Sequence, residues 1–364
     1  MAQYLGVVVI LGMLIVLHEL GHFSAAKWLG VSVKQFAVGF GPALWTKTVG
    51  ETDYRINAIP LRGYCAFLDD ENRADIPAGD QRYIANRKVW ERALIISGGV
   101  IMNAITAYLV MASSFFAMGV PTDQVHPGLR VGQVMANMPA KIAGLQPMDK
   151  IMAVDGKELK GGRSLQELLK NHKASPVALT VHRANTDLTL TVTPTAEGKI
   201  GVEVGPEPVM RPTTGVLEPF TLAGTAMVNS TKMLLSALGM LVTGQLSWTQ
   251  VGGPIGVVKM GGDVAKADWT NLYTFTALIS LELAIINFLP LPALDGGHLM
   301  LLIIEKLRGR PLPRPVEDQI MQGGLLTLLF LGVLLIFKDV VSLVTGEGPG
   351  GAPPRCPASG SPPV

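Results

Sequence analysis

Four long apolar stretches dominate this chain of 364 residues and constrain its fold more than any other feature. They cover residues 1–26, 93–122, 269–294 and 319–337 and contain two formal charges, Glu19 and Glu282. A helix crosses the hydrocarbon core of a bilayer with about 20 mostly apolar residues. The whole chain is 16% charged, against about 25% for an ordinary soluble domain. We therefore predict a multi-pass α-helical membrane protein with four transmembrane helices.

The first stretch lacks the basic start and small-residue cleavage site of a signal peptide, so we interpret it as a retained helix. Basic residues gather between the first and second stretches and between the third and fourth, which places both loops in the cytoplasm. Both termini and the long segment after the second stretch are then expected outside. The formal net charge of +2 does not indicate a nucleic-acid-binding protein.

These patterns divide the chain into nine predicted segments. They are a transmembrane helix (1–28), a cytoplasmic-side re-entrant β-hairpin with a linker (29–92), a second transmembrane helix (93–120), an extracytoplasmic domain (128–206), a surface helix with a connector (207–268), a broken third transmembrane helix (269–305), a cytoplasmic loop (306–318), a fourth transmembrane helix (319–344) and a disordered tail (346–364).

One segment, residues 233–258, permits two interpretations. It has no formal charge and opens with an apolar run, but polar residues and Gly252-Gly253-Pro254 interrupt it. An amphipathic helix on the outer surface fits this pattern better than a fifth span.

A small α+β module is predicted from about Gly128 to Pro206, with five short strands and helices at 139–143 and 164–171. Its sequence VGQVMANMPAKIAGLQPMDKIMAVDGKEL resembles a circularly permuted bacterial PDZ domain. Met148 stands where that family usually has glycine. The resemblance implies a peptide ligand bound at a sheet edge; a spacer that only sizes access to the membrane is the alternative.

Residues 33–68 contain two runs rich in β-forming residues, 36–45 and 54–67, with a plausible turn at 49–53. We predict that these runs form a β-hairpin. It is too short to span a bilayer and too apolar to be exposed to water, so we expect it to fold back into the protein as a re-entrant element. The tail, residues 346–364, is of low complexity and is expected to be disordered.

The sequence His18-Glu19-Leu20-Gly21-His22 lies inside the first stretch and matches the HExxH pattern of zinc metalloproteases. On a helix, His18 and His22 project from one face one turn apart, and Glu19 lies about 100° round the axis. Three ionisable residues in an apolar helix require a partner, and a divalent cation satisfies all three. The alternative is a pair of core histidines hydrogen-bonded with Glu19.

A catalytic zinc needs a third protein ligand. At membrane depth the strong candidates are Glu282 and residues 287–298, NFLPLPALDGGH. Pro290 and Pro292 must break a helix there, and Asp295 at such a break is well placed as a ligand.

HELGH, the sequence GFGP at residues 39–42, the PDZ-like module and NFLPLPALDGG at residues 287–297 together resemble the site-2 protease family. The resemblance is to its bacterial regulator-of-sigma-E branch with one PDZ domain, and it runs from about residue 1 to 345. It implies an intramembrane zinc metalloprotease in the bacterial inner membrane, with its active site in the cytoplasmic half of the bilayer. The implied substrates are single-span membrane proteins, including anti-sigma factors and remnant signal peptides.

The same resemblance implies Zn²⁺ bound by His18, His22 and Asp295, with Glu19 as the general base. It assigns Asn287 and the residues Gly39, Phe40, Gly41 and Pro42 to substrate binding or oxyanion stabilisation. The hairpin is similar to a re-entrant β element whose edge pairs with the unwound substrate.

Several positions depart from the family pattern. Arg62 and Cys65-Ala66-Phe67 replace the Gly and Val-Lys-Met that usually follow Ile-Pro-Leu, and Gly99 stands where the family often has proline. Glu282 occupies a position that is commonly a neutral Asn, and it could be protonated, paired with a base or on a water path to zinc.

Two other classes of protein fit parts of the sequence. A zinc transporter would also carry His and acidic residues in its spans, but this chain shows no internal repeat. A catalytically silent PDZ membrane scaffold would keep the fold without needing Glu19.

Overall fold

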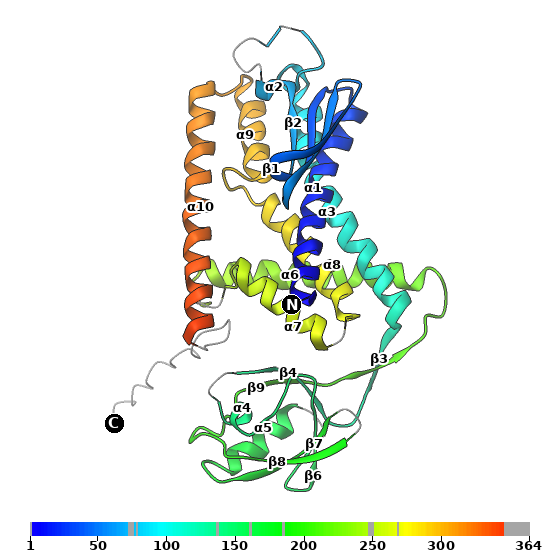
Figure 1. The fold of residues 1–364 in the computed structure, drawn as a ribbon, viewed down its shortest axis with the longest axis vertical. Helices are drawn as coiled ribbons and strands as arrows, with labels where there is room; N and C mark the ends of the chain where they lie inside the picture. Colours follow the sequence, from blue (N-terminus) through cyan, green and yellow to red (C-terminus); the bar gives the residue numbers. More distant parts are fainter. Residues whose placement is uncertain are drawn as a thin grey trace. The chain divides into compact units, whose positions relative to one another are not determined.

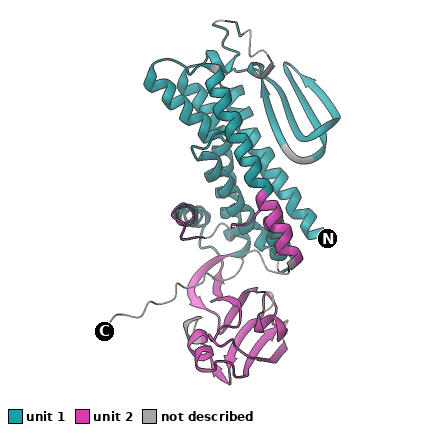
Figure 2. Ribbon diagram, turned by 90° about the vertical axis from the view of Figure 1, so that its left-hand side faces the viewer, with its two compact units in different colours: residues 1–118, 213–239, 258–333 teal, residues 119–212, 240–257, 334–364 magenta. Residues whose placement is uncertain are grey.

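A computed structural model describes residues 2–71, 76–77, 79–135, 138–159, 162–183, 186–246, 251–267 and 269–345 (Figure 1). The chain forms two compact units, shown in Figure 2. The first comprises residues 1–118, 213–239 and 258–333, and the second comprises residues 119–212, 240–257 and 334–364. The tail predicted to be disordered, residues 346–364, lies outside the described residues.

Long apolar helices build most of the first unit. Those entirely within it are α1 (Ala2–Trp28), α3 (Val89–Met118), α8 (Asn271–Phe288) and α9 (Asp295–Arg308), with the short α2 (Leu68–Glu71) and the 3₁₀ turn η1 (Ile84–Asn86). Three further helices continue into the second unit: α6 (Glu218–Val242), α7 (Pro254–Ala267) and α10 (Arg314–Thr345).

The ends of these helices follow from local sequence. The α1 helix stops before Gly30, whose φ of 73° is the left-handed conformation that closes a helix C-terminus. The α8 helix ends at Phe288 because Pro290 and Pro292 cannot continue it, and α9 begins at Asp295. The predicted break in the third apolar stretch is therefore present at residues 289–294.

Glycine lets α1 and α3 approach each other closely. A Cβ atom added at Gly21 would lie 2.1 Å from the Gly98 carbonyl oxygen, so the two backbones are in contact. On its other side, α3 accepts a hydrogen bond at the Asn103 carbonyl oxygen from Ser280 of α8 (2.8 Å). The helix α3 is thus the central element between α1 and α8.

The helices α1 and α8 run in the same direction. Near the start of each, Val7 and Phe275 lie against Gly261 of α7, since a Cβ added there would come 2.8 Å from both side chains. Further along, His18 of α1 meets Asp295, which follows α8. In Figure 1 α6 lies across these helices, and in Figure 2, which is turned by 90°, it is seen nearly end-on.

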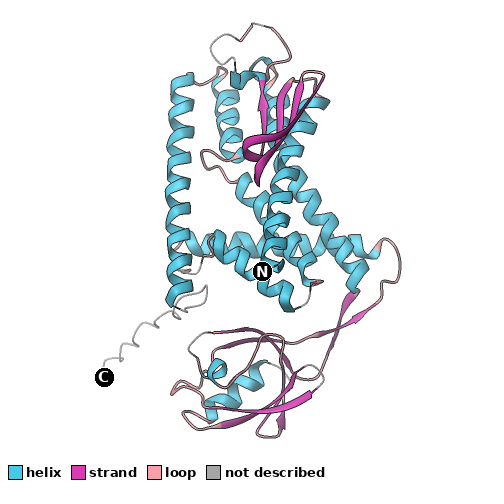
Figure 3. Ribbon diagram, in the orientation of Figure 1, coloured by secondary structure: helices cyan, strands magenta, loops and turns pink. Residues whose placement is uncertain are grey.

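The hairpin consists of β1 (Val33–Val49) and β2 (Thr52–Phe67), joined at Gly50 (Figure 3). The predicted runs 36–45 and 54–67 lie within these two strands. Residues 33–38 pair with both residues 53–56 and residues 63–67, whereas residues 43–49 pair with residues 52–57. The curled sheet therefore has residues 63–67 along one edge.

A six-stranded sheet organises the second unit, in the order β8-β7-β5-β4-β9 with β6 beside β5. The strands are β4 (Leu129–Val134), β5 (Lys150–Val154), β6 (Lys157–Glu158), β7 (Val177–Arg183), β8 (Thr186–Val192) and β9 (Val202–Gly205), with helices α4 (Pro139–Ile142) and α5 (Gly162–Asn171). Strands β3 (Val120–Val125) and β10 (Pro208–Arg211) pair with each other before and after this module. The observed strands β4, β5, β7, β8 and β9 overlap the five predicted ones, which were residues 129–135, 151–154, 177–182, 188–192 and 200–204.

The turn before β5 contains the departure noted at Met148. Its φ is 75°, a conformation that usually requires glycine. The next residue, Asp149, is buried and receives two side-chain hydrogen bonds from Arg183, of 2.7 and 2.6 Å. This pair secures the turn in spite of the unfavourable backbone at Met148.

Five helices in the described part of the chain are long and apolar enough to cross a membrane, one more than predicted. The fifth is α6, which has the lowest mean hydropathy of the five. The prediction of a helix over residues 233–258 was wrong in its bounds, because α6 begins at Glu218 and ends at Val242, and α7 begins at Pro254 after Gly252 and Gly253. The four-span topology stays a prediction.

Candidate metal centre

Three predicted ligands from two distant parts of the sequence meet in the first unit. His18 and His22 project from one face of α1, and Asp295 is the first residue of α9. The two Nε2 atoms lie 3.2 Å apart, and Asp295 Oδ2 lies 3.3 Å from that of His18 and 3.4 Å from that of His22. The three side chains are between 12 and 18% exposed.

This triangle has the dimensions that zinc requires. In a tetrahedral site, ligand atoms about 2.0–2.1 Å from zinc lie about 3.3–3.4 Å from one another. Asp295 Oδ2 is also buried without a hydrogen bond among the described residues, which is costly for a carboxylate unless a cation is present. Two imidazoles and one carboxylate form a donor set known from catalytic zinc sites. The three residues therefore fit a zinc ion.

Contacts on the far side of each imidazole orient its Nε2 atom. His22 Nδ1 lies 2.9 Å from the Ile95 carbonyl oxygen and donates its proton there, which leaves Nε2 with a free lone pair. The amide of Asn103 lies 3.2 Å from His18 Nδ1, and its Oδ1 atom has no partner among the described residues. Turning this amide by 180° lets Oδ1 accept the Nδ1 proton of His18, as metal binding at Nε2 requires.

Gly99 of α3 leaves the space in which the two imidazoles stand. An added Cβ atom would lie 2.5 Å from His18 Cε1 and 2.5 Å from His22 Nε2. Contacts this short do not occur between real side chains, so with α1 and α3 placed as they are in this chain a larger residue must move both rings from their present positions. In the sequence, Gly99 is noticeable only as a departure from the family pattern. Its contact with the two histidines was not predicted.

The loop that delivers Asp295 is tightly folded. Ala293 has a φ of 71°, a strained conformation for a residue with a side chain. A Cβ atom at Gly296 would lie 2.2 Å from the Leu289 carbonyl oxygen, and one at Gly297 would lie 2.3 Å from that of Leu291. Both glycines are therefore needed for α9 to fold back onto residues 289–294 and hold Asp295 at the centre.

A cavity of about 650 Å³ in the first unit contains the three candidate ligands. Glu19 and Asn287 also line it, so the structure brings together the predicted base and the predicted polar residue. Gly39, Phe40, Gly41 and Pro42 are not among the lining residues. Gly39 and Gly41, with φ of 87° and 92°, instead form the bend at which β1 reverses.

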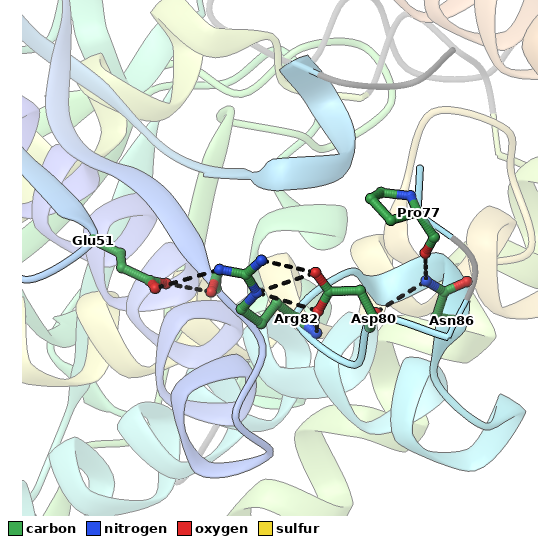
Figure 4. A network of polar contacts seen from close by, with 6 residues as sticks. Glu51, Pro77, Asp80, Arg82 and Asn86 are labelled. Carbon is green, nitrogen blue, oxygen red and sulfur yellow. Dashed lines mark hydrogen bonds and ion pairs between the residues drawn. The ribbon is translucent and has the colours of Figure 1, made fainter. Parts of the chain in front are cut away.

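A polar network links residues 76–77 and 79–87 to the hairpin turn (Figure 4). Arg82 donates to Asp80 (2.8 Å) and lies 3.8 Å from Glu51 at the hairpin turn. The side-chain hydrogen bond from Arg82 lowers the pKa of Asp80. Asn86 donates to the Pro77 carbonyl oxygen (2.8 Å). Ile84 of this segment lines the cavity, so the network lies beside one of its walls.

Comparison with known proteins assigns the family. The profile of peptidase family M50 matches residues 6–331, which is most of the chain. The chain belongs to peptidase family M50. It is 40% identical over 355 residues to the protein all3971 of Nostoc sp., whose provisional name is zinc metalloprotease. The match covers 94% of this chain and 96% of the relative.

Two other relatives of this M50 peptidase have informative names. The membrane metalloprotease ARASP, chloroplastic, of Arabidopsis thaliana is 35% identical, with 92% of this chain and 78% of the relative covered. The zinc metalloprotease RasP of Bacillus licheniformis is 28% identical, with 92 and 98% covered. The predicted family, enzyme class and cofactor are thus confirmed: the chain is a zinc metalloprotease with several helices apolar enough for a membrane.

Two residues of this M50 site were missing from the predicted set, Gly99 and Asn103. A signal for Asn103 was present, since an amide inside a charge-free span usually has a specific partner. No comparable signal marks the Ile95 carbonyl oxygen, because every residue has a backbone carbonyl. Which carbonyl accepts the proton of His22 depends on how α1 and α3 pack.

Proposed function

We propose that this zinc metalloprotease cleaves peptide bonds within the transmembrane segments of single-span proteins. The observation that carries the proposal is the depth of the triangle formed by His18, His22 and Asp295. His18 is about 24 Å along α1 from its start, at 1.5 Å per residue, and the hydrocarbon core is about 30 Å thick. The centre therefore belongs inside the bilayer.

In this proposal His18, His22 and Asp295 hold zinc. When bound, zinc polarises the peptide carbonyl and lowers the pKa of an attacking water toward 7. The carboxylate of Glu19, beside His18 in the same cavity, accepts the proton of that water and returns it to the leaving amine. The side-chain amide of Asn287 donates to the oxygen that gains negative charge.

A transmembrane helix must unwind locally before it can be cleaved, because its carbonyls are locked in hydrogen bonds. The hairpin edge at residues 63–67 runs beside the cavity and can offer its own N–H and C=O groups to an extended substrate. This pairing replaces the hydrogen bonds that the substrate loses.

The directions of the helices support four spans. The helices α1 and α8 run in the same direction, and α3 runs between them in the opposite direction. If all three cross the membrane, the chain must cross it an even number of times between the end of α3 and the start of α8. The helix α7, with 14 residues, is about 21 Å long and too short to cross. We therefore infer that α6 lies on the outer surface, as its orientation in Figures 1 and 2 favours.

The module of residues 128–206 is proposed to be an extracytoplasmic PDZ domain of a bacterial inner-membrane enzyme. It would bind peptide segments at a sheet edge or exclude proteins with bulky outer domains. The proposed substrates, anti-sigma factors and remnant signal peptides, have little structure outside the membrane. Three ligands that meet at one point, instead of a series along a route, disfavour a zinc transporter.

The test is cell-based cleavage of a panel of tagged single-span proteins by wild type and Glu19→Gln. This substitution keeps the shape of the side chain and removes the base, so cleavage should fall by at least about 100-fold. Glu197→Gln, on a side chain that is 73% exposed, is the matched control and should cleave normally. Equal processing by wild type and Glu19→Gln would instead favour a catalytically silent scaffold.

A further inference from the structure

We propose that Cys65 and Phe67, on the edge strand of the hairpin, form the wall of a subsite that binds an apolar side chain of the substrate near the scissile bond. The inference rests on the proposed protease function. It assigns a selectivity role to two positions where this chain departs from the family pattern.

Strand geometry aims both side chains at the catalytic residues. Gly63 is buried, and a Cβ atom added there would lie 3.1 Å from Glu19 Cγ and 3.6 Å from Val16 Cα. Side chains of a strand alternate between its faces, so Cys65 and Phe67 share the face of Gly63. Both of them line the cavity that contains Glu19, His18 and His22.

The spacing along the strand locates the subsite. An extended chain rises about 3.3 Å per residue, so Cys65 is about 7 Å from the level of Gly63 and Glu19. A substrate strand paired beside this edge has the same repeat. If its reacting residue lies level with Gly63, the side chain two residues away lies beside Cys65, and Phe67 closes the far end.

The buried side of this wall is apolar, although Asp69 and Arg92 also line the cavity. Cys65, Phe67 and Ile84 pack against the buried cluster that contains Val31, Val33 and Ile95. Ile84 and Ile95 also line the cavity. Burial against such a surface favours an aliphatic side chain and disfavours a charged one. The subsite therefore takes a residue such as leucine, which transmembrane segments supply, and its width is set by the small thiol of Cys65.

The first experiment measures selectivity with the full-length protein. Substrates identical except at the residues two positions from the cleavage site, carrying Gly, Leu or Phe, are cleaved in competition. Cys65→Phe should lower the Leu-to-Gly ratio of kcat/KM by at least about 10-fold, the scale of hydrophobic-pocket discrimination. Phe67→Ala and the milder Phe67→Leu should raise the Phe-to-Leu ratio.

The matched control is Trp45→Ala, an aromatic residue of the same hairpin that is 48% exposed and pairs with Ile56 in the strand away from this edge. It should leave both ratios unchanged. Ratios from one reaction do not depend on expression or on zinc content. Unchanged ratios in all three variants at Cys65 and Phe67, or an equal change in Trp45→Ala, would overturn the subsite.

The second experiment does not need catalysis. Cys65 and Cys356 are the two cysteines of the chain, so Cys356→Ser leaves one thiol to follow. In Glu19→Gln, Cys356→Ser protein, an intact substrate segment should slow maleimide alkylation of Cys65 by at least about 10-fold if it fills a pocket at that thiol. Alkylation at the same rate with saturating segment would reject the subsite.

The two experiments separate this inference from the proposed function. If wild type cleaves the panel and Glu19→Gln does not, unchanged selectivity ratios reject the subsite and leave the protease assignment standing. If wild type cleaves nothing, the protease proposal fails, and the alkylation measurement decides the subsite by itself.

Discussion

Gly99→Ala tests whether the packing of α3 against α1 creates the metal centre. The substitution adds one methyl group, 2.5 Å from ring atoms of both His18 and His22. Carbon atoms in contact prefer about 3.5–4.0 Å, so the rings must move by about 1 Å. Zinc tolerates deviations of about 0.2 Å in its ligand distances. One methyl group should therefore separate two of the three candidate ligands from the third.

The expected loss is large for a change that removes no ligand. We expect zinc affinity to fall by at least about 100-fold, or about 2.8 kcal/mol, with a comparable loss of cleavage. Zinc content of the purified protein after competition with a graded chelator measures the affinity. Cleavage of a tagged single-span substrate measures the activity.

Gly6→Ala is the matched control, because it lies on α1 and a Cβ atom there would meet nothing within 4 Å among the described residues. Alanine favours a helix over glycine by about 1 kcal/mol, so this variant should bind zinc normally. Full zinc affinity and cleavage in Gly99→Ala would refute the reasoning, since it would mean that the imidazoles do not occupy the space beside Gly99.

Three further predictions concern the second unit. Arg183→Met should destabilise the module by about 3–5 kcal/mol, because it leaves the carboxylate of Asp149, whose side chain is 2% exposed, without its ion pair; hydrogen exchange of β5 amides measures this, and unchanged protection would contradict it. Met148→Gly should stabilise the same module by about 1 kcal/mol by relieving the positive φ, seen as slower exchange, and faster exchange would show that the Met148 side chain matters more. Burial raises the pKa of Glu207, but ion pairs with Lys150 and Arg130 outweigh it and lower the pKa below the ordinary 4.5. The stabilisation by Glu207 should thus be present above pH about 4.5 and disappear as pH falls through the folded pKa. Glu207→Gln should reduce the pH dependence of hydrogen exchange at the β4 amides. An unchanged pH dependence would show that another group titrates.

Features fixed by neighbouring residues could be predicted from the sequence. The break between α8 and α9 follows from Pro290 and Pro292, and the shared face of His18 and His22 follows from helix periodicity. The paired runs of the hairpin and the strands of the module also carry strong local patterns.

Features that depend on packing between distant segments could not be predicted. The contact of Gly99 with both imidazoles requires the close approach of α1 and α3, and neither helix encodes it alone. Residues 33–38 pair with two parts of β2 because Gly39 and Gly41 bend β1 back, whereas alternation of side chains predicts only a simple hairpin. The start of α6 at Glu218 was missed because its first two turns are less apolar than the rest.

The central claim is that His18, His22 and Asp295 hold one zinc ion for a reaction that Glu19 assists. Zinc K-edge X-ray absorption of the purified protein, measured on wild type, Glu19→Gln and Asp295→Ala, tests it most directly. We predict one zinc per chain with nitrogen and oxygen ligands at about 2.0–2.1 Å in wild type and Glu19→Gln, and loss of most zinc in Asp295→Ala. A sulfur ligand in wild type, or an unchanged zinc content and spectrum in Asp295→Ala, would contradict the account.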